Sequence, residues 1–133
     1  MVTAALVEAA ERLGYPYHVG YSCSTGSWYC GQGRPGYKGY TQSFIQNKVE
    51  DLRRARVMNF EMETSCLFTL AGLYGLRAGS VCTAFANRKK NEMAYGGMER
   101  SIHVANLAVQ ILHEWDMKME ESGKSYWYPS LTK

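Results

Sequence analysis

A glycine-flanked run in the first third of the chain combines an aromatic side chain with two groups that can recognise a planar heterocycle. Residues 27–34 contain Trp28, Gln32 and Arg34, with a glycine on each side of Gln32. Glycine allows the backbone to approach a ligand closely. Glutamine donates and accepts hydrogen bonds, and arginine presents a planar fork of donors. The pattern indicates a site for a ring with carbonyls and an N–H, and a plain surface loop is the alternative on composition alone.

Two acids around Met62 form the second candidate site. Glu61 and Glu63 stand where a short apolar run gives way to a helical pattern. In α/β folds, ligands gather outside the carboxyl ends of strands, and a carboxylate there can accept hydrogen bonds from paired sugar hydroxyls. The alternative is that Glu63 only complements the dipole of the following helix. Neither this pair nor any other acid pair has a companion that predicts a metal site.

The hydrophobic pattern predicts helices alternating with strands. Helices are expected over residues 3–13, 41–55, 63–74 and 98–121, and strands over residues 17–23, 57–60 and 78–86. A long irregular loop fills residues 26–39, a length typical of functional loops. The alternation predicts an α/β fold with a mixed or largely parallel sheet flanked by helices. The faces expected to be buried are Cys66, Leu67, Leu70 and Leu73 on the third helix, and Ile102, Ala105, Val109 and Leu112 on the last.

Length and composition are those of one soluble globular domain. The chain has 133 residues, 46% hydrophobic and 20% charged, and we expect a domain over residues 1–121 with an irregular tail at 122–133. A net charge of +3 is too small to indicate nucleic acid as a partner. No run approaches the ~20 apolar residues that span a bilayer, and the first residues lack a signal-peptide pattern. Four cysteines without metal or redox spacing favour a reducing, cytoplasmic setting.

Three segments resemble one enzyme family. Residues 27–34 are similar to the uracil-specificity loop of uridine phosphorylases, aromatic-Tyr-x-Gly-Gln-x-Arg. Residues 58–63 are similar to the Glu-Met-Glu ribose motif of the wider nucleoside phosphorylase superfamily, and residues 77–88 to the following strand, which ends in Asn-Arg. Their order and spacing agree over residues 2–115. The resemblance implies the carboxyl-terminal half of a nucleoside phosphorylase, as a partial layered α/β fold.

The resemblance also implies a role for each matching residue. Gln32 and Arg34 would hydrogen-bond the uracil carbonyls and ring nitrogen, and Glu63 would bind the 2′ and 3′ hydroxyls of ribose. Arg34, Glu63 and Arg88 are the implied catalytic residues. The other implied substrate contacts are Trp28 packed on the nucleoside, Phe60 and Phe85 lining the base pocket, Met62 under the ribose, Glu61 in the same motif, and Arg88 near the far edge of the pyrimidine. Purine-specific relatives carry an aspartate at Asn87 or Arg88, so its absence favours a pyrimidine.

The implied reaction is reversible phosphorolysis of uridine to uracil and ribose 1-phosphate, with phosphate as co-substrate and no cofactor or metal. The family's amino-terminal half carries a Gly-Asp-Pro-x-Arg phosphate loop, which is not found in this sequence. The expected partners are therefore a complementing amino-terminal half or further copies in a homo-oligomer. The alternatives are a non-catalytic nucleoside-binding or assembly module, as a truncated or split subunit, and a nucleosidase that uses water.

Overall fold

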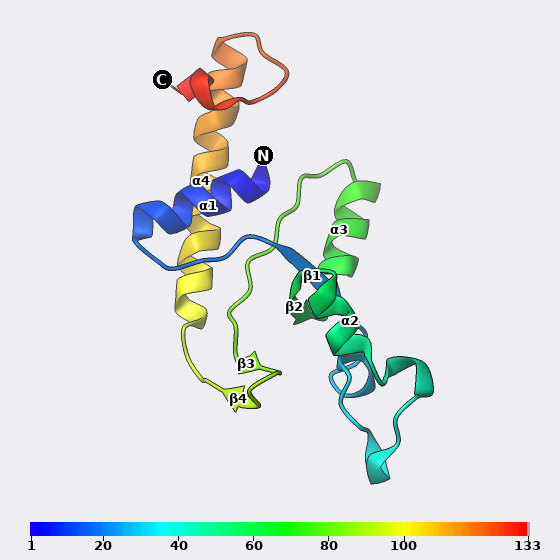
Figure 1. The fold of residues 1–133 in the computed structure, drawn as a ribbon. Helices are drawn as coiled ribbons and strands as arrows, with labels where there is room; N and C mark the ends of the chain where they lie inside the picture. The colour runs from blue at the N-terminus through cyan, green and yellow to red at the C-terminus, as the bar shows by residue number, and fades with distance from the viewer. Residues whose placement is uncertain (133) are drawn as a thin grey trace. The chain divides into compact units, whose positions relative to one another are not determined.

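The computed structural model describes residues 1–132, which form two compact units (Figure 1). The central unit is His18–Leu76, and the terminal unit joins Met1–Tyr17 to Arg77–Lys133. Helices combine with a small parallel sheet, so the predicted partial α/β fold is confirmed. No helix in the described part of the chain is long and apolar enough to cross a membrane.

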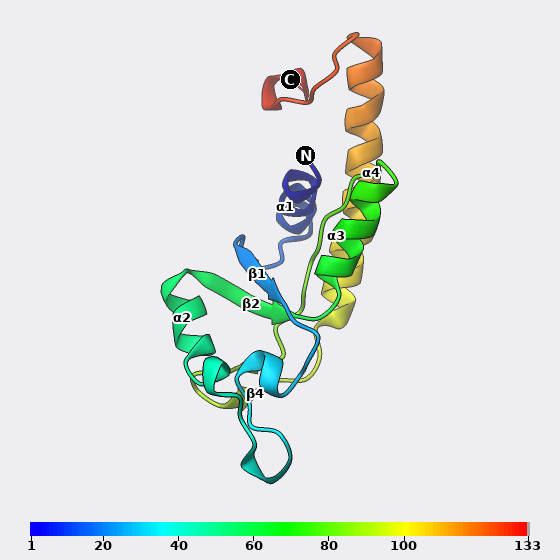
Figure 2. The same ribbon diagram turned by 90° about the vertical axis from the view of Figure 1, so that its right-hand side faces the viewer.

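The central unit is built on two parallel strands, β1 (Tyr21–Ser24) and β2 (Val57–Glu61), which run side by side (Figure 2). Helix α2 (Lys48–Arg54) leads into β2, and helix α3 (Thr64–Leu73) follows it. Acids in the first turn of α2 and arginines in its last turn complement the helix dipole. Because parallel strands end at the same edge, Ser24 pairs with Glu61 at the point where both strands stop.

Two predicted elements of the central unit are shorter than expected. The strand expected over residues 17–23 begins at Tyr21, which is paired with Val57, the first residue of β2, so the preceding residues have no partner strand. The helix expected over residues 41–55 covers only Lys48–Arg54, after separate 3-10 turns at Tyr37–Gly39 and Ser43–Ile45. Gln42 is extended, and Asn47 has φ −101° and ψ 3°, outside the regular helical range, so the backbone at Asn47 separates the turn at Ser43–Ile45 from α2.

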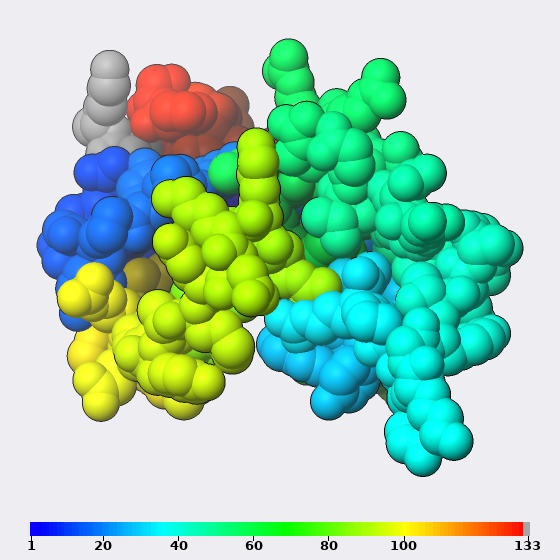
Figure 3. Space-filling model, turned by 60° about the horizontal axis from the view of Figure 1, so that its bottom comes forward, coloured from blue at the N-terminus to red at the C-terminus, as the bar shows by residue number. Residues whose placement is uncertain are grey.

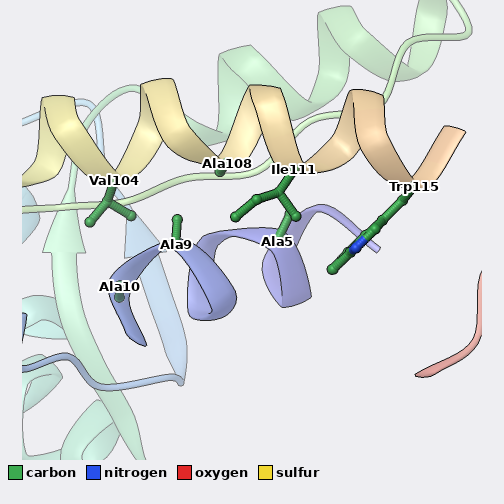
Figure 4. Close-up of a cluster of buried hydrophobic side chains, with 7 residues drawn as sticks. All are labelled: Ala5, Ala9, Ala10, Val104, Ala108, Ile111 and Trp115. Atoms are coloured by element: carbon green, nitrogen blue, oxygen red, sulfur yellow. The ribbon is translucent and has the colours of Figure 1, made fainter. Parts of the chain in front are cut away.

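Helix α1 (Val2–Leu13) packs against helix α4 (Met98–Glu121) to form the core of the terminal unit (Figure 4). The buried cluster consists of Ala5, Ala9, Ala10, Val104, Ala108, Ile111 and Trp115. The small alanines of α1 let the two helices approach closely, and Ile111 fills the space between them. Trp127, in the tail, stacks on Trp115 with ring centroids 4.1 Å apart, and a 3-10 turn follows at Pro129–Thr132.

The predicted inner faces of two helices are wrong. On α4, Ile102 and Val109 are exposed, Ala105 is half-buried, and Leu112 packs against the core as expected, while the fully buried positions lie on the neighbouring face that meets α1. On α3, all four residues expected inside are exposed, and only Thr64 and Ala71 are buried. Both helices carry apolar residues on more than one face. The periodicity therefore indicates a helix without indicating which face has a partner.

The buried strand predicted over residues 78–86 is also wrong. Only Ala86–Asn87 (β3) is a strand, paired antiparallel with Glu92–Met93 (β4) across a tight turn. The Asn87 side chain organises that turn by accepting hydrogen bonds at 3.1 Å from two backbone N–H groups. Gly79 instead lies against α1, where a Cβ atom would come within 2.3 Å of Val2. Val81, Cys82 and Ala84 are exposed, so the apolar run in this segment marks neither a paired strand nor a buried one.

Candidate nucleoside site in the central unit

The ends of β1 and β2 are tied to the start of α3 by one carboxylate. Glu61 is buried and accepts hydrogen bonds from the backbone N–H groups of Glu63, at 2.9 Å, and Thr64, at 2.6 Å. Its other oxygen accepts a short hydrogen bond from the Ser24 hydroxyl. Ser24 Oγ in turn accepts the N–H of Ser65 at 2.8 Å. The pair therefore satisfies three N–H groups at the helix start that no helical carbonyl can reach.

This environment keeps Glu61 ionised. Burial alone would raise the pKa of its carboxyl group, but the hydrogen bonds from Ser24, Thr64 and Glu63 outweigh burial and lower the pKa to about 2. The positive end of α3 favours the same charge state. Glu61 is thus a fixed anion whose oxygens are engaged by protein donors, and its role in this structure is to hold the site together.

Glu63 differs from Glu61 because its side chain is exposed. One of its oxygens accepts the Met62 backbone N–H at 3.0 Å, which holds the carboxylate close to the end of β2. Met62 is likewise exposed beside it. Of the two acids, Glu63 is therefore the one placed to accept hydrogen bonds from a ligand's hydroxyls.

The loop after β1 presents a stacked aromatic–guanidinium pair. The Arg34 guanidinium carbon lies 4.3 Å from the centre of the Trp28 ring, a cation–π distance. Gln32, between them in sequence, is buried with only 4% of its surface exposed. The backbone N–H groups of Gln32 and Arg34 both donate to the Tyr29 carbonyl, at 3.0 and 2.9 Å. Trp28 and Arg34 are therefore in contact, and Gln32 lies within the same turn of the backbone.

Two glycines of this loop are required by its packing. Gly33 has φ +72°, and a Cβ atom there would lie 2.7 Å from a Val49 methyl group. A Cβ on Gly31 would lie 2.5 Å from the Thr25 hydroxyl oxygen. The Lys48 ammonium also donates to the Gly31 carbonyl at 2.6 Å, which anchors the loop to α2. The loop is therefore pressed against both the strand end and α2.

The remaining predicted residues are divided between the two units. Phe60 lies half-buried in β2, next to Glu61. Phe85 and Arg88 belong to the terminal unit, where they flank β3. The arrangement described above is consequently built from the central unit alone, with Trp28, Gln32 and Arg34 in the loop and Phe60, Glu61, Met62 and Glu63 at the end of β2.

Three residues that position the site were not singled out from the sequence. Ser24 binds Glu61, Thr25 donates its backbone N–H to the Glu61 carbonyl at 2.9 Å, and Lys48 holds Gly31. The available signal was a pair of hydroxyl residues directly after the strand predicted over residues 17–23. Such residues lie at the same sheet edge as the acids that follow the second parallel strand. Among the described residues, no group of three or more His, Cys, Asp or Glu side chains could hold a metal ion.

The comparisons with known proteins place the chain in a family. The model of the phosphorylase superfamily matches residues 2–113. The chain belongs to the phosphorylase superfamily.

Within that superfamily, the matching relatives are named as uridine phosphorylases. The predicted resemblance to uridine phosphorylases is therefore confirmed. The chain is 56% identical to the uridine phosphorylase of Thermococcus kodakarensis over 130 residues, which cover 98% of this chain and 47% of that protein. It is 39% identical to the uridine phosphorylase of Escherichia coli over 92 residues, which cover 68% of this chain and 36% of that protein. A mouse protein, uridine phosphorylase 2, is 36% identical to this chain over 81 residues, which cover 58% of this chain and 25% of the mouse protein. The chain thus spans less than half the length of the curated relatives it matches.

Proposed function

We propose that this chain is the nucleoside-binding part of a uridine phosphorylase, the enzyme that converts uridine and phosphate reversibly to uracil and ribose 1-phosphate. The observation that carries the proposal is the Arg34 guanidinium over the Trp28 ring, in the loop that also contains the buried Gln32. The named relatives support the same activity. The chemical class of enzyme is a pentosyltransferase.

The loop would recognise uracil by its edge. Uracil presents two carbonyl acceptors and an N–H donor in one plane, which a glutamine amide and a guanidinium fork can match. Stacking on Trp28 restricts the Arg34 fork to one plane before substrate arrives. A restricted side chain loses less conformational entropy on binding. Phe60 is a proposed part of the apolar wall of the base pocket.

Arg34 would also lower the barrier to reaction. Phosphate attacks C1′ as the bond from C1′ to the uracil nitrogen breaks, so the bonding electrons pass to uracil and spread onto its carbonyl oxygens. A cation at those oxygens binds the transition state more strongly than the substrate. Removing such a donor costs about 2.7–4 kcal/mol of activation free energy.

Glu63 would hold the ribose, with Met62 beneath the ring. Its exposed carboxylate can accept hydrogen bonds from the 2′ and 3′ hydroxyl groups, and this fixes C1′ for in-line attack. Glu61 would contribute by fixing the backbone that carries Glu63, because its oxygens bind the N–H groups of Glu63 and Thr64. The reaction as proposed uses no cofactor.

The complete activity would need a phosphate site from outside this segment, supplied by a complementing amino-terminal polypeptide. Assembly into a homo-oligomer remains part of the proposal. A cytoplasmic setting is proposed on the four free cysteines.

A phosphorolysis assay tests the proposal. Uridine is incubated with the chain alone and with the chain plus the part of the Thermococcus kodakarensis relative that this chain does not match. We expect uracil to appear only when phosphate and the second polypeptide are both present. Uridine binding without any uracil release would favour a non-catalytic binding module. Uracil release that does not depend on phosphate would favour a nucleosidase.

A further inference from the structure

The peptide bond that precedes Gln32 is held at both ends by other parts of the central unit. The Gly31 carbonyl accepts a hydrogen bond from the Lys48 ammonium group at 2.6 Å. The Gln32 N–H donates to the Tyr29 carbonyl at 3.0 Å. Because this carbonyl and this N–H belong to one planar peptide unit, the two bonds together fix the plane from which Gln32 projects.

The glycines on either side of Gln32 make such outside support necessary. Glycine adopts a wide range of φ and ψ angles, so Gly31 and Gly33 do not by themselves fix the direction of the residue between them. Helix α2 contacts the loop at both glycines. Lys48 binds the Gly31 carbonyl, and a Cβ atom on Gly33 would lie 2.7 Å from a methyl group of Val49. Two consecutive residues of α2 therefore hold the loop on both sides of Gln32.

Of these two contacts, the one made by Lys48 is a directed bond. A hydrogen bond with an ionised donor is roughly twice as strong as one between neutral groups. Lys48 and Gly31 are both half-buried, so water competes less for the bond than it would at an exposed site. Val49 supplies only van der Waals contact at Gly33. Lys48 is thus the side chain of α2 whose loss should release the loop most.

We propose that Lys48 is a positioning residue for uracil recognition, which acts by holding the Gly31 carbonyl so that Gln32 and Arg34 keep the arrangement that binds the base. Arg34 is included because its backbone N–H donates to Tyr29 at 2.9 Å, the same carbonyl that Gln32 uses. A loop that is ordered before the ligand arrives loses less conformational entropy on binding. The inference rests on the proposed function and adds to it a residue that does not touch the ligand.

Titration of Lys48→Met with uridine and with uracil tests the inference. Methionine keeps an unbranched apolar side chain and removes the charge and the donor. We expect both ligands to bind about tenfold more weakly, because a charge-assisted hydrogen bond is lost. The loss should be equal for the two ligands, since the loop reads only the base. A general distortion of the unit would also disturb Glu63 and would weaken uridine binding more than uracil binding.

Two further variants are the controls. Lys48→Arg keeps a cation of similar reach and should restore both affinities to within about threefold of the unmodified chain. Arg54→Met removes a cation from an exposed position on the same helix and should change both affinities by less than about twofold. Circular dichroism checks that each variant is folded. If Lys48→Met does not fold, Lys48→Gln, which removes only the charge and part of the length, takes its place in the same titrations.

A measurement without ligand separates the role of Lys48 from the proposed function. A chain labelled with 5-fluorotryptophan contains three labelled residues, and Trp28→Phe assigns the fluorine NMR resonance of Trp28. The Arg34 guanidinium carbon lies 4.3 Å from the centre of that ring, so this resonance reports the arrangement of the loop. It should shift in Lys48→Met and return in Lys48→Arg. If the unmodified chain binds neither ligand, the proposed function fails, and this resonance still decides whether Lys48 orders the loop.

Four results would overturn the inference. The first is Lys48→Met binding uracil as tightly as the unmodified chain does. The second is a loss of affinity in Lys48→Met with an unchanged Trp28 resonance. The third is a failure of Lys48→Arg to restore binding. The fourth is a loss for uridine well above the loss for uracil, because Lys48 would then support the whole unit rather than the loop.

Discussion

Ser24 and Glu61 are joined by a short hydrogen bond at the ends of two parallel strands, and together they accept three backbone N–H groups at the start of α3. The site depends on this pair because Glu63 follows Glu61 by two residues and the loop that carries Arg34 follows Ser24. One side chain on each strand thus sets the spacing between the two candidate binding elements.

Replacing Ser24 should loosen this junction. In Ser24→Ala the Ser65 N–H and one Glu61 oxygen lose their partner, and an unsatisfied polar group costs about 1–3 kcal/mol of folding free energy. Urea unfolding of the central unit, followed by tryptophan fluorescence, measures the loss. Ser22→Ala is the control, since Ser22 lies on the same strand, is exposed and makes only long contacts. Equal stability of the two variants would contradict the assignment.

Because of Glu61, the free energy of unfolding should fall as the solution becomes acidic. Its pKa lies at about 2 in the folded chain, below its ordinary value of 4.5. A lowered folded pKa contributes stability that is fully present above about pH 4.5 and is lost as the pH falls towards 2. Unfolding free energies measured across this range should fall less steeply in Glu61→Gln than in the unmodified chain. The same slope in both proteins would show that the carboxylate is not held as described.

Replacing Glu61 and replacing Glu63 should have different effects on ligand binding and on thermal stability. Glu63→Gln removes an exposed carboxylate, so it should weaken uridine binding about tenfold, leave uracil binding unchanged and leave the melting temperature within a degree or two. Glu61→Gln removes a buried anion that three donors bind, so it should lower the melting temperature by several degrees. Calorimetric titration with uridine and uracil, beside thermal melts, separates them. A reversal of this pattern would assign the ribose contact to Glu61.

Much of the element order was predictable, because segments with a strong helical period, such as α1 and α4, can be identified as helices from the sequence. The buried faces were not predictable. Ile102 and Val109 fit a helical stripe as well as Val104 and Ala108 do, and the choice between them depends on the alanines of α1, far away in sequence. The segment 78–86 fails for a related reason, since an apolar run is a strand only where a partner strand exists.

The sequence indicates the candidate binding residues, but it does not indicate the residues that hold them in place. Gln32, Arg34 and Glu63 are indicated by their match to the uridine phosphorylase motifs, because composition alone leaves a surface loop and a helix-dipole role as alternatives. Ser24 and Lys48 are common surface residues in sequence, and their roles appear only when the strand register and the position of α2 are known. The segment around residue 40, coloured cyan in the space-filling view, projects from the rest of the central unit (Figure 3).

The conformation of the loop that carries Gln32 and Arg34 should depend on Gly33. In Gly33→Ala the added Cβ meets Val49 at 2.7 Å while the backbone stays at φ +72°, a region that costs a non-glycine residue about 1–2 kcal/mol. Uridine binding should weaken at least tenfold because Arg34 is displaced from Trp28. Gly26→Ala, in the same loop with nothing within 4 Å, is the matched control and should bind normally. The proposed conformation fails if both variants bind alike.

Titration of the chain with uridine tests the central claim, that the loop carrying Gln32 and Arg34 recognises uracil. We expect saturable binding of uridine, much weaker binding of inosine, and at least a tenfold loss of uridine affinity in Arg34→Lys, because an ammonium cannot replace a stacked planar fork. Arg54→Lys, an exposed arginine on α2, should bind as the unmodified chain does. Equal affinity for uridine in the Arg34 and Arg54 variants, or equal binding of inosine and uridine, would contradict the account.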